Sequence, residues 1–122
     1  MTTKQLNVGE VGNVRRELIF SEDIAEGIVQ TLEKYEDYQL PLNLGFNSDI
    51  TIRDLAEKIA KLVDFSGDIK WDQTRPDGQS RKLLNSIRWK LSDIELNQTS
   101  LDDGLRKTIE WYKENKNDKS ET

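Results

Sequence analysis

Three amphipathic helix patterns, separated by short strand-like runs, constrain the fold of this chain more than any other feature. In each pattern apolar residues recur at steps of three and four, which is typical of a helix with one buried face. The three sets are Ile24, Ala25, Ile28, Val29, Leu32 and Tyr35; Ile52, Leu55, Ala56, Ile59, Leu62 and Val63; and Leu101, Leu105, Ile109 and Tyr112. Strand-like runs span 17–20, 40–45 and 68–72, and a short helix is expected from residue 85 or 86 to 91. The alternation predicts a mixed α/β fold.

Residues suited to helix starts precede all three patterns. Ser21, Thr51 and Ser100 are good N-caps, because a hydroxyl oxygen accepts a hydrogen bond from an amide of the first turn. Glu22 and Asp23 favour the positive end of a helix dipole. We therefore expect three main helices that begin at these positions.

The composition excludes several classes of function. The chain has 122 residues, enough for one domain, and its hydrophobic content of 34% is lean for independent folding. A net charge of −5 argues against general binding to nucleic acid or to an anionic membrane. The chain has no cysteine and no histidine, which removes thiolate metal sites, disulfides and the commonest general base. No apolar run could span a bilayer and no signal-peptide core is present, so a cytoplasmic location is expected.

The segment 75–84, RPDGQSRKLL, concentrates a turn, a carboxylate and three cations. Pro76 fixes its own φ, and Asp-Gly tolerates turn conformations. The charged residues are Arg75, Asp77, Arg81 and Lys82. Guanidinium groups suit phosphate and a carboxylate accepts from ribose hydroxyls, so a nucleotide-sugar diphosphate would match these groups. A solvated turn explains the same residues, and the segment alone leaves both interpretations open.

A family resemblance covers the chain from about Leu6 to Asn115, and five segments carry it: 15–25, 43–45, 50–56, 75–84 and 100–112. In this order and spacing they resemble the GDP-L-fucose synthases, which belong to the NAD-dependent epimerases and dehydratases of the extended short-chain dehydrogenase/reductase family. The resemblance implies the C-terminal substrate-binding part of that α/β fold, with about three main helices, short strands and no Rossmann half. It places a truncated substrate-binding domain at 1–115 and a polar tail at 116–122.

The motifs that carry cofactor and catalysis in this family do not occur in the chain. Gly9 and Gly12 are the nearest candidates for the Gly-rich turn, but they lack a third glycine and a following helix. Only Tyr112 and Lys116 show the Tyr-x-x-x-Lys spacing, and we interpret this match in the final helix as coincidence. We expect no catalytic, cofactor-binding or metal-binding residue here; NADP is implied only for the complete family enzyme.

The resemblance also implies four substrate-binding residues, which are Arg16, Asp77, Arg81 and Lys82. Arg16 stands at the second arginine of the family's RRE motif, which contacts the GDP-sugar. Asp77 stands at a substrate-contacting aspartate. For Arg16 the alternative is an exposed arginine at the start of a strand, paired with Glu17 or Glu22. For Arg81 and Lys82 the alternative is a structural role or electrostatic focusing.

The resulting hypothesis is that the chain is the GDP-sugar recognition portion of a GDP-L-fucose synthase-like, NADP-dependent epimerase/reductase. In that family GDP-4-keto-6-deoxymannose becomes GDP-L-fucose, and we expect no catalysis by this chain alone. Expected partners are a GDP-sugar and either a separate Rossmann-domain chain or a second copy, joined through an exposed sheet edge and uncovered apolar surface. The alternatives are a stand-alone nucleotide-sugar-binding or regulatory module and a degenerate remnant that acts as an interaction protein.

Overall fold

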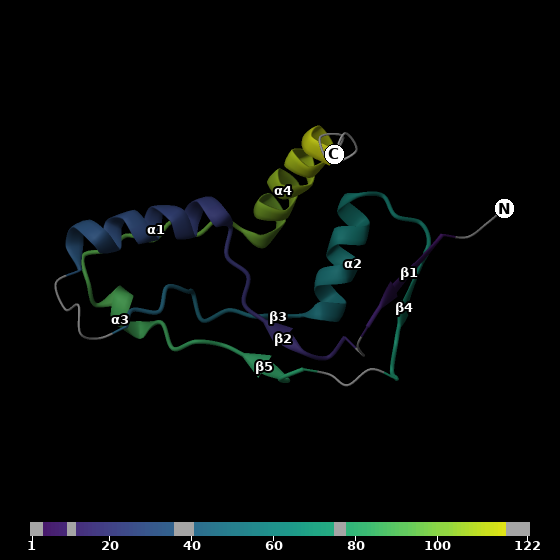
Figure 1. Ribbon diagram of the computed structural model, residues 1–122, viewed down its shortest axis with the longest axis horizontal. Coiled ribbons are helices and arrows are strands. Elements are labelled where there is room, and N and C mark those ends of the chain that lie inside the picture. The colour runs from purple at the N-terminus through teal and green to yellow at the C-terminus, as the bar shows by residue number, and fades with distance from the viewer. Residues whose placement is uncertain (1–3, 10–11, 36–40, 75–77, 117–122) are drawn as a thin grey trace. The chain divides into compact units, whose positions relative to one another are not determined.

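The computed structural model divides into two compact units, which are described separately (Figure 1). The first unit comprises Met1–Leu18 and Asn47–Leu84, and the second comprises Ile19–Phe46 and Asn85–Thr122. The residues that the structure describes are 4–9, 12–35, 41–74 and 78–116. Residue 77 of the predicted site and residues 117–122 of the predicted tail lie outside these ranges.

The described residues of the first unit form two small sheets and one long helix. Its elements are β1 (Gln5–Val8), β2 (Arg15–Arg16), β3 (Ile50–Thr51), α2 (Ile52–Leu62), β4 (Asp68–Trp71) and β5 (Arg81–Lys82). β1 pairs with β4 in parallel. In the other sheet β2 lies in the centre, antiparallel to β3 and parallel to β5.

Helix α2 begins where the sequence predicts, because its first amides all have acceptors. The Thr51 hydroxyl accepts from the Asp54 amide at 3.1 Å, which confirms Thr51 as the N-cap. The Ile52 amide donates to the Val14 carbonyl and the Arg53 amide donates to the Gly12 carbonyl, each at 3.0 Å. The segment that leads into β2 therefore fixes the start of α2, and Val14 is buried there.

Gly12 is required by its conformation and by its neighbours. Its φ is +85°, in the region that favours glycine, and a Cβ at this position would meet the Trp71 ring at 3.0 Å. The Arg53 guanidinium lies over the same ring, 4.7 Å from its centroid. Trp71 thus contacts both the start of α2 and the turn before β2.

The second unit contains three helices in its described residues, α1 (Ser21–Lys34), α3 (Ile87–Lys90) and α4 (Leu101–Asn115). The Ser100 hydroxyl accepts from the Asp103 amide at 3.1 Å, which confirms the predicted cap of α4. The prediction for α1 is wrong by one residue: Phe20 is the N-cap, without a side-chain cap bond, and Ser21 is already helical. The three long helices and the short one within 85–91 are confirmed.

Two of the three predicted strands are wrong. The strand expected at 17–20 lies instead at 15–16, because the Glu17 carboxylate accepts from the Ser48 amide and Phe20 caps α1. Residues 41–45 form no strand, because the carbonyls of Pro41 and Gly45 accept from side chains of α3 instead of from a neighbouring strand. The strand at 68–71 is confirmed.

The helical period of α1 is correct, but the burial it predicts is not. Ile28, Val29 and Leu32 are 53%, 53% and 75% exposed. Tyr112 on α4, expected on a buried face, is 61% exposed. These helices therefore carry exposed apolar residues, of the kind that the family resemblance implies for a chain without the Rossmann half. No helix in the described ranges is long and apolar enough to cross a bilayer.

Candidate functional site

The sheet of the first unit brings three of the four predicted site residues together. Strands β2 and β5 pair so that Arg15 lies opposite Arg81 and Arg16 lies opposite Lys82. Because successive side chains of a strand point to opposite faces, the Arg15–Arg81 pair and the Arg16–Lys82 pair lie on opposite faces of the ladder. The fourth predicted residue, Asp77, lies outside the described residues.

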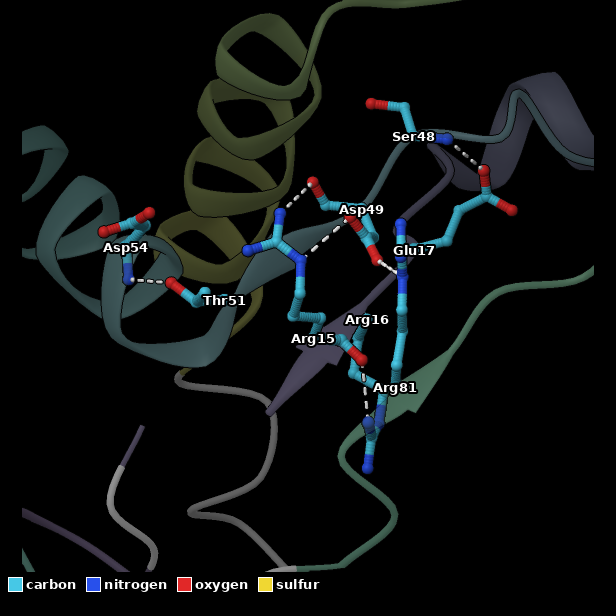
Figure 2. A network of polar contacts seen from close by, with 8 residues as sticks. All are labelled: Arg15, Arg16, Glu17, Ser48, Asp49, Thr51, Asp54 and Arg81. Atoms are coloured by element: carbon cyan, nitrogen blue, oxygen red, sulfur yellow. Dashed lines mark hydrogen bonds and ion pairs between the residues drawn. The ribbon is translucent and has the colours of Figure 1, made fainter. Parts of the chain in front are cut away.

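Arg15 and Arg81 share one carboxylate, that of Asp49 (Figure 2). The Arg15 Nε donates to Oδ1 at 3.0 Å, and the Arg81 Nε donates to Oδ2 at 2.7 Å. The Asp49 side chain is only 5% exposed, whereas the arginines are 42% and 58% exposed. Arg81, predicted as a ligand contact, therefore joins β5 to the segment before β3, which fits the alternative of a structural role.

The environment of Asp49 keeps its carboxyl ionised. Burial raises the pKa of Asp49, but hydrogen bonds from Arg81 and Arg15, together with their charges, outweigh burial and hold this pKa below its ordinary value. Asp49 therefore neutralises one positive charge of the four that β2 and β5 carry at neutral pH.

Arg16 is oriented by main-chain acceptors. Its Nη1 donates to the carbonyls of Arg15 and Gln79, each at 2.7 Å, and not to the carboxylate of Glu17 or Glu22 that the alternative interpretation expected. Figure 2 shows its head group pointing away from Asp49. A Cβ at Gly78 would lie 3.5 Å from Nη2, so the turn before β5 adjoins the guanidinium. An arginine has five N–H donors, and these two bonds use only Nη1.

Lys82 completes the Arg16 face. Its side chain is exposed, and it forms no hydrogen bond or ion pair with another described residue. A guanidinium held at one end and a lysine ammonium opposite it form a cationic pair that suits an anion with several oxygens. We call Arg16 and Lys82 the cation pair.

The second unit has a hollow of about 360 Å³ with a different character. Its lining residues are Phe20, Ser21, Glu22, Lys107, Thr108 and Trp111. The Lys107 ammonium lies 5.3 Å from the centre of the Phe20 ring, and Glu22 brings an opposite charge. One cation and one carboxylate give this hollow no preference for an anion, unlike the cation pair.

Comparison with known proteins finds similarity to enzymes named for GDP-sugar chemistry, in sequence and in fold. Arabidopsis thaliana GDP-L-fucose synthase 1 is 36% identical over 113 residues, which are 92% of this chain and 34% of the plant protein. A GDP-6-OMe-4-keto-L-xylo-heptose reductase from C. jejuni has a TM-score of 0.80 at 27% identity, and the match covers 91% of this chain and 34% of the reductase. A GDP-L-fucose synthetase from Naegleria fowleri, bound to NADP, has a TM-score of 0.85 at 22% identity. The match covers 93% of this chain and 34% of the synthetase, and at this identity it shows the fold alone. No protein-family model matches the chain.

The fold is that of the C-terminal part of an extended short-chain dehydrogenase/reductase. Within that class the chain is a relative of the GDP-L-fucose synthases. It spans about a third of the length of the relatives that it matches.

The described residues do not fit the NADP that one of these neighbours binds. A dinucleotide is held by a Gly-rich turn between a strand and a helix. Here β1 and Gly12 lead to β2 rather than to a helix, and the Gly12 carbonyl accepts from the Arg53 amide. Within the described ranges, no group of three or more acidic residues could hold a metal ion.

Proposed function

We propose that this chain recognises a GDP-sugar as the substrate-binding part of a GDP-L-fucose synthase-like, NADP-dependent epimerase/reductase, and that it does not catalyse the reaction alone. The observation that carries the proposal is the β2–β5 register, which sets Arg16 opposite Lys82 although they are far apart in sequence. The relatives named for GDP-sugar chemistry support the choice of nucleotide.

The proposed contacts follow from the charge and geometry of the donors. A diphosphate offers oxygens that a guanidinium binds through two N–H groups and that an ammonium binds as a point charge. Arg16 and Lys82 take these roles. Asp77 adjoins Gly78 in the sequence, and we assign it to nucleotide hydroxyl or amine groups. Arg81 supports the site through Asp49 instead of contacting the ligand.

The exposed apolar residues of α1 support a protein partner as well. Ile28, Val29 and Leu32 lie on one helix and are all more than half exposed. A Rossmann-domain polypeptide would both cover such a surface and supply the cofactor chemistry that the described residues do not fit. We therefore propose that this polypeptide is the partner, in the cytoplasm, and that activity requires it.

Calorimetric titration of GDP-L-fucose into the chain tests the proposal. Arg16→Ala, Lys82→Ala and Asp77→Ala each remove one proposed contact. Lys70→Ala is the matched control, because Lys70 is an exposed cation of the same unit on β4. We expect saturable binding that the first three substitutions weaken about tenfold each, the scale of a lost charge-assisted hydrogen bond, and that Lys70→Ala leaves unchanged.

Two results would contradict the proposal. One is the absence of binding by a chain shown to be folded by circular dichroism. The other is equal weakening by Lys70→Ala and Lys82→Ala, since that pattern indicates a general charge effect rather than a site.

A further inference from the structure

We propose that Asp49 is a positioning residue for the cation pair: by holding Arg15 and Arg81 it sets β2 against β5 and so fixes the spacing of Arg16 and Lys82 for a diphosphate. This inference rests on the proposed function for its ligand. It adds a residue that contacts neither the ligand nor the cation pair directly.

The contacts around Asp49 link three separate parts of the chain. Its two carboxylate oxygens each accept from a different arginine, one on β2 and one on β5. Its own main-chain carbonyl lies 3.5 Å from the Arg15 Nη2. Asp49 also directly precedes β3, the antiparallel neighbour of β2. One nearly buried carboxylate therefore connects all three strands of this sheet (Figure 2).

The strands themselves are too short to set this spacing. β2, β3 and β5 have two residues each, and a ladder of that length offers few backbone hydrogen bonds. The Arg15 amide donates to the Ser80 carbonyl at 2.8 Å, just before β5 begins. Two charge-assisted bonds to one carboxylate are the stronger restraint on the distance between β2 and β5.

Positioning and simple electrostatics predict opposite signs. Replacement of Asp49 by asparagine removes a negative charge beside four cations, so a purely electrostatic effect would tighten the binding of an anion. If Asp49 positions the cation pair, the same replacement loosens β2 against β5 and weakens binding. Asp49→Asn is nearly isosteric, so the sign of the change separates the two effects.

The experiment compares Asp49→Asn with Asp68→Asn, which removes one exposed carboxylate from the same unit. Hydrogen exchange of the Arg15 amide reports on the ladder without any ligand, and the amides of Asp54 and Asp72, bonded to Thr51 and Val8, serve as internal references. Titrations with GDP and with GMP report on the consequence for binding. Both affinities would fall equally if the variant were simply less folded, whereas a change of spacing lowers the preference for GDP over GMP.

We expect Asp49→Asn to speed exchange of the Arg15 amide, to weaken GDP binding about tenfold relative to Asp68→Asn, and to reduce the GDP preference. Unchanged Arg15 exchange overturns the inference whatever the ligand does. Faster exchange with GDP binding equal to or tighter than that of Asp68→Asn overturns it too. If the unaltered chain binds no GDP, the proposed function fails, and exchange alone then decides whether Asp49 holds the strands.

Discussion

Thr99 donates two hydrogen bonds to the carboxylate of Asp23, from its amide to Oδ2 at 2.7 Å and from its hydroxyl to Oδ1 at 2.9 Å. Asn97 adds a third, from Nδ2 to Oδ1 at 3.1 Å. Asp23 is buried in the first turn of α1, and Thr99 directly precedes the cap of α4. This carboxylate therefore joins the start of α1 to the segment that leads into α4.

Asp23→Asn should lower the free energy of unfolding by about 2 kcal/mol, because an asparagine cannot accept from all three donors and leaves at least one buried and unpaired. Urea denaturation measures the change. Asp93→Asn is the control, because Asp93 is an exposed carboxylate of the same unit. A loss no larger than that of the control would mean that the bonds to Asp23 contribute nothing net.

Stability should also depend on pH through Asp23. Burial raises the pKa of Asp23, but the bonds from Thr99 and Asn97 and the charge of Lys107 outweigh it and hold this pKa below its ordinary value of 3.8. A carboxyl with a lowered folded pKa stabilises the fold above its unfolded pKa and loses that contribution as pH falls through the folded value. Urea midpoints from pH 7 to pH 3 should fall more steeply for the unaltered chain than for Asp23→Asn. Parallel curves would contradict this linkage.

Thr51→Ala should cost about 1 kcal/mol of stability, because the Asp54 amide loses its side-chain acceptor at the start of α2. Thr51→Ser keeps the hydroxyl and should recover most of the loss. Ser66→Ala, at an exposed position outside any helix or strand, is the control. Equal losses for the serine and alanine variants at position 51 would show that the hydroxyl is not the cause.

Gly12→Ala should destabilise the chain by about 1–3 kcal/mol, because alanine at φ +85° is strained and its methyl group meets the Trp71 ring. Gly78→Ala is the matched control, since a Cβ there would lie 3.5 Å from the Arg16 Nη2, which is an ordinary contact distance. Thermal unfolding of both variants tests the difference. A Gly12→Ala variant as stable as Gly78→Ala would argue against this conformation.

The sequence predicts the helices well and the strands poorly. Periodicity and capping residues are local signals, so Thr51 and Ser100 can be identified as caps from their own neighbourhoods. Strands of two residues have no period to detect, and their pairing depends on partners distant in sequence. The run at 41–45 is apolar enough for a strand, yet its carbonyls accept from Arg88 and Trp89 instead.

The residues of the candidate site can be named from the sequence, but their arrangement cannot, because strand pairing depends on partners distant in sequence. Arg16, Arg81 and Lys82 follow from the family resemblance, and the structure brings them into one sheet. Which cations share a face depends on the strand register, so the sequence cannot separate Arg81, which binds Asp49, from Lys82, which lies opposite Arg16. Asp49 carries no signal of its own, because an aspartate before a short strand is usually a turn residue.

The most direct test of the proposed site is an amide chemical-shift map of the ¹⁵N-labelled chain during titration with GDP-L-fucose. We predict that the changes concentrate on β2, on β5 and on Gly78 and Gln79, and that they saturate with one ligand per chain. No saturable change at these amides, or changes confined to the second unit, would contradict the claim that Arg16 and Lys82 bind the diphosphate.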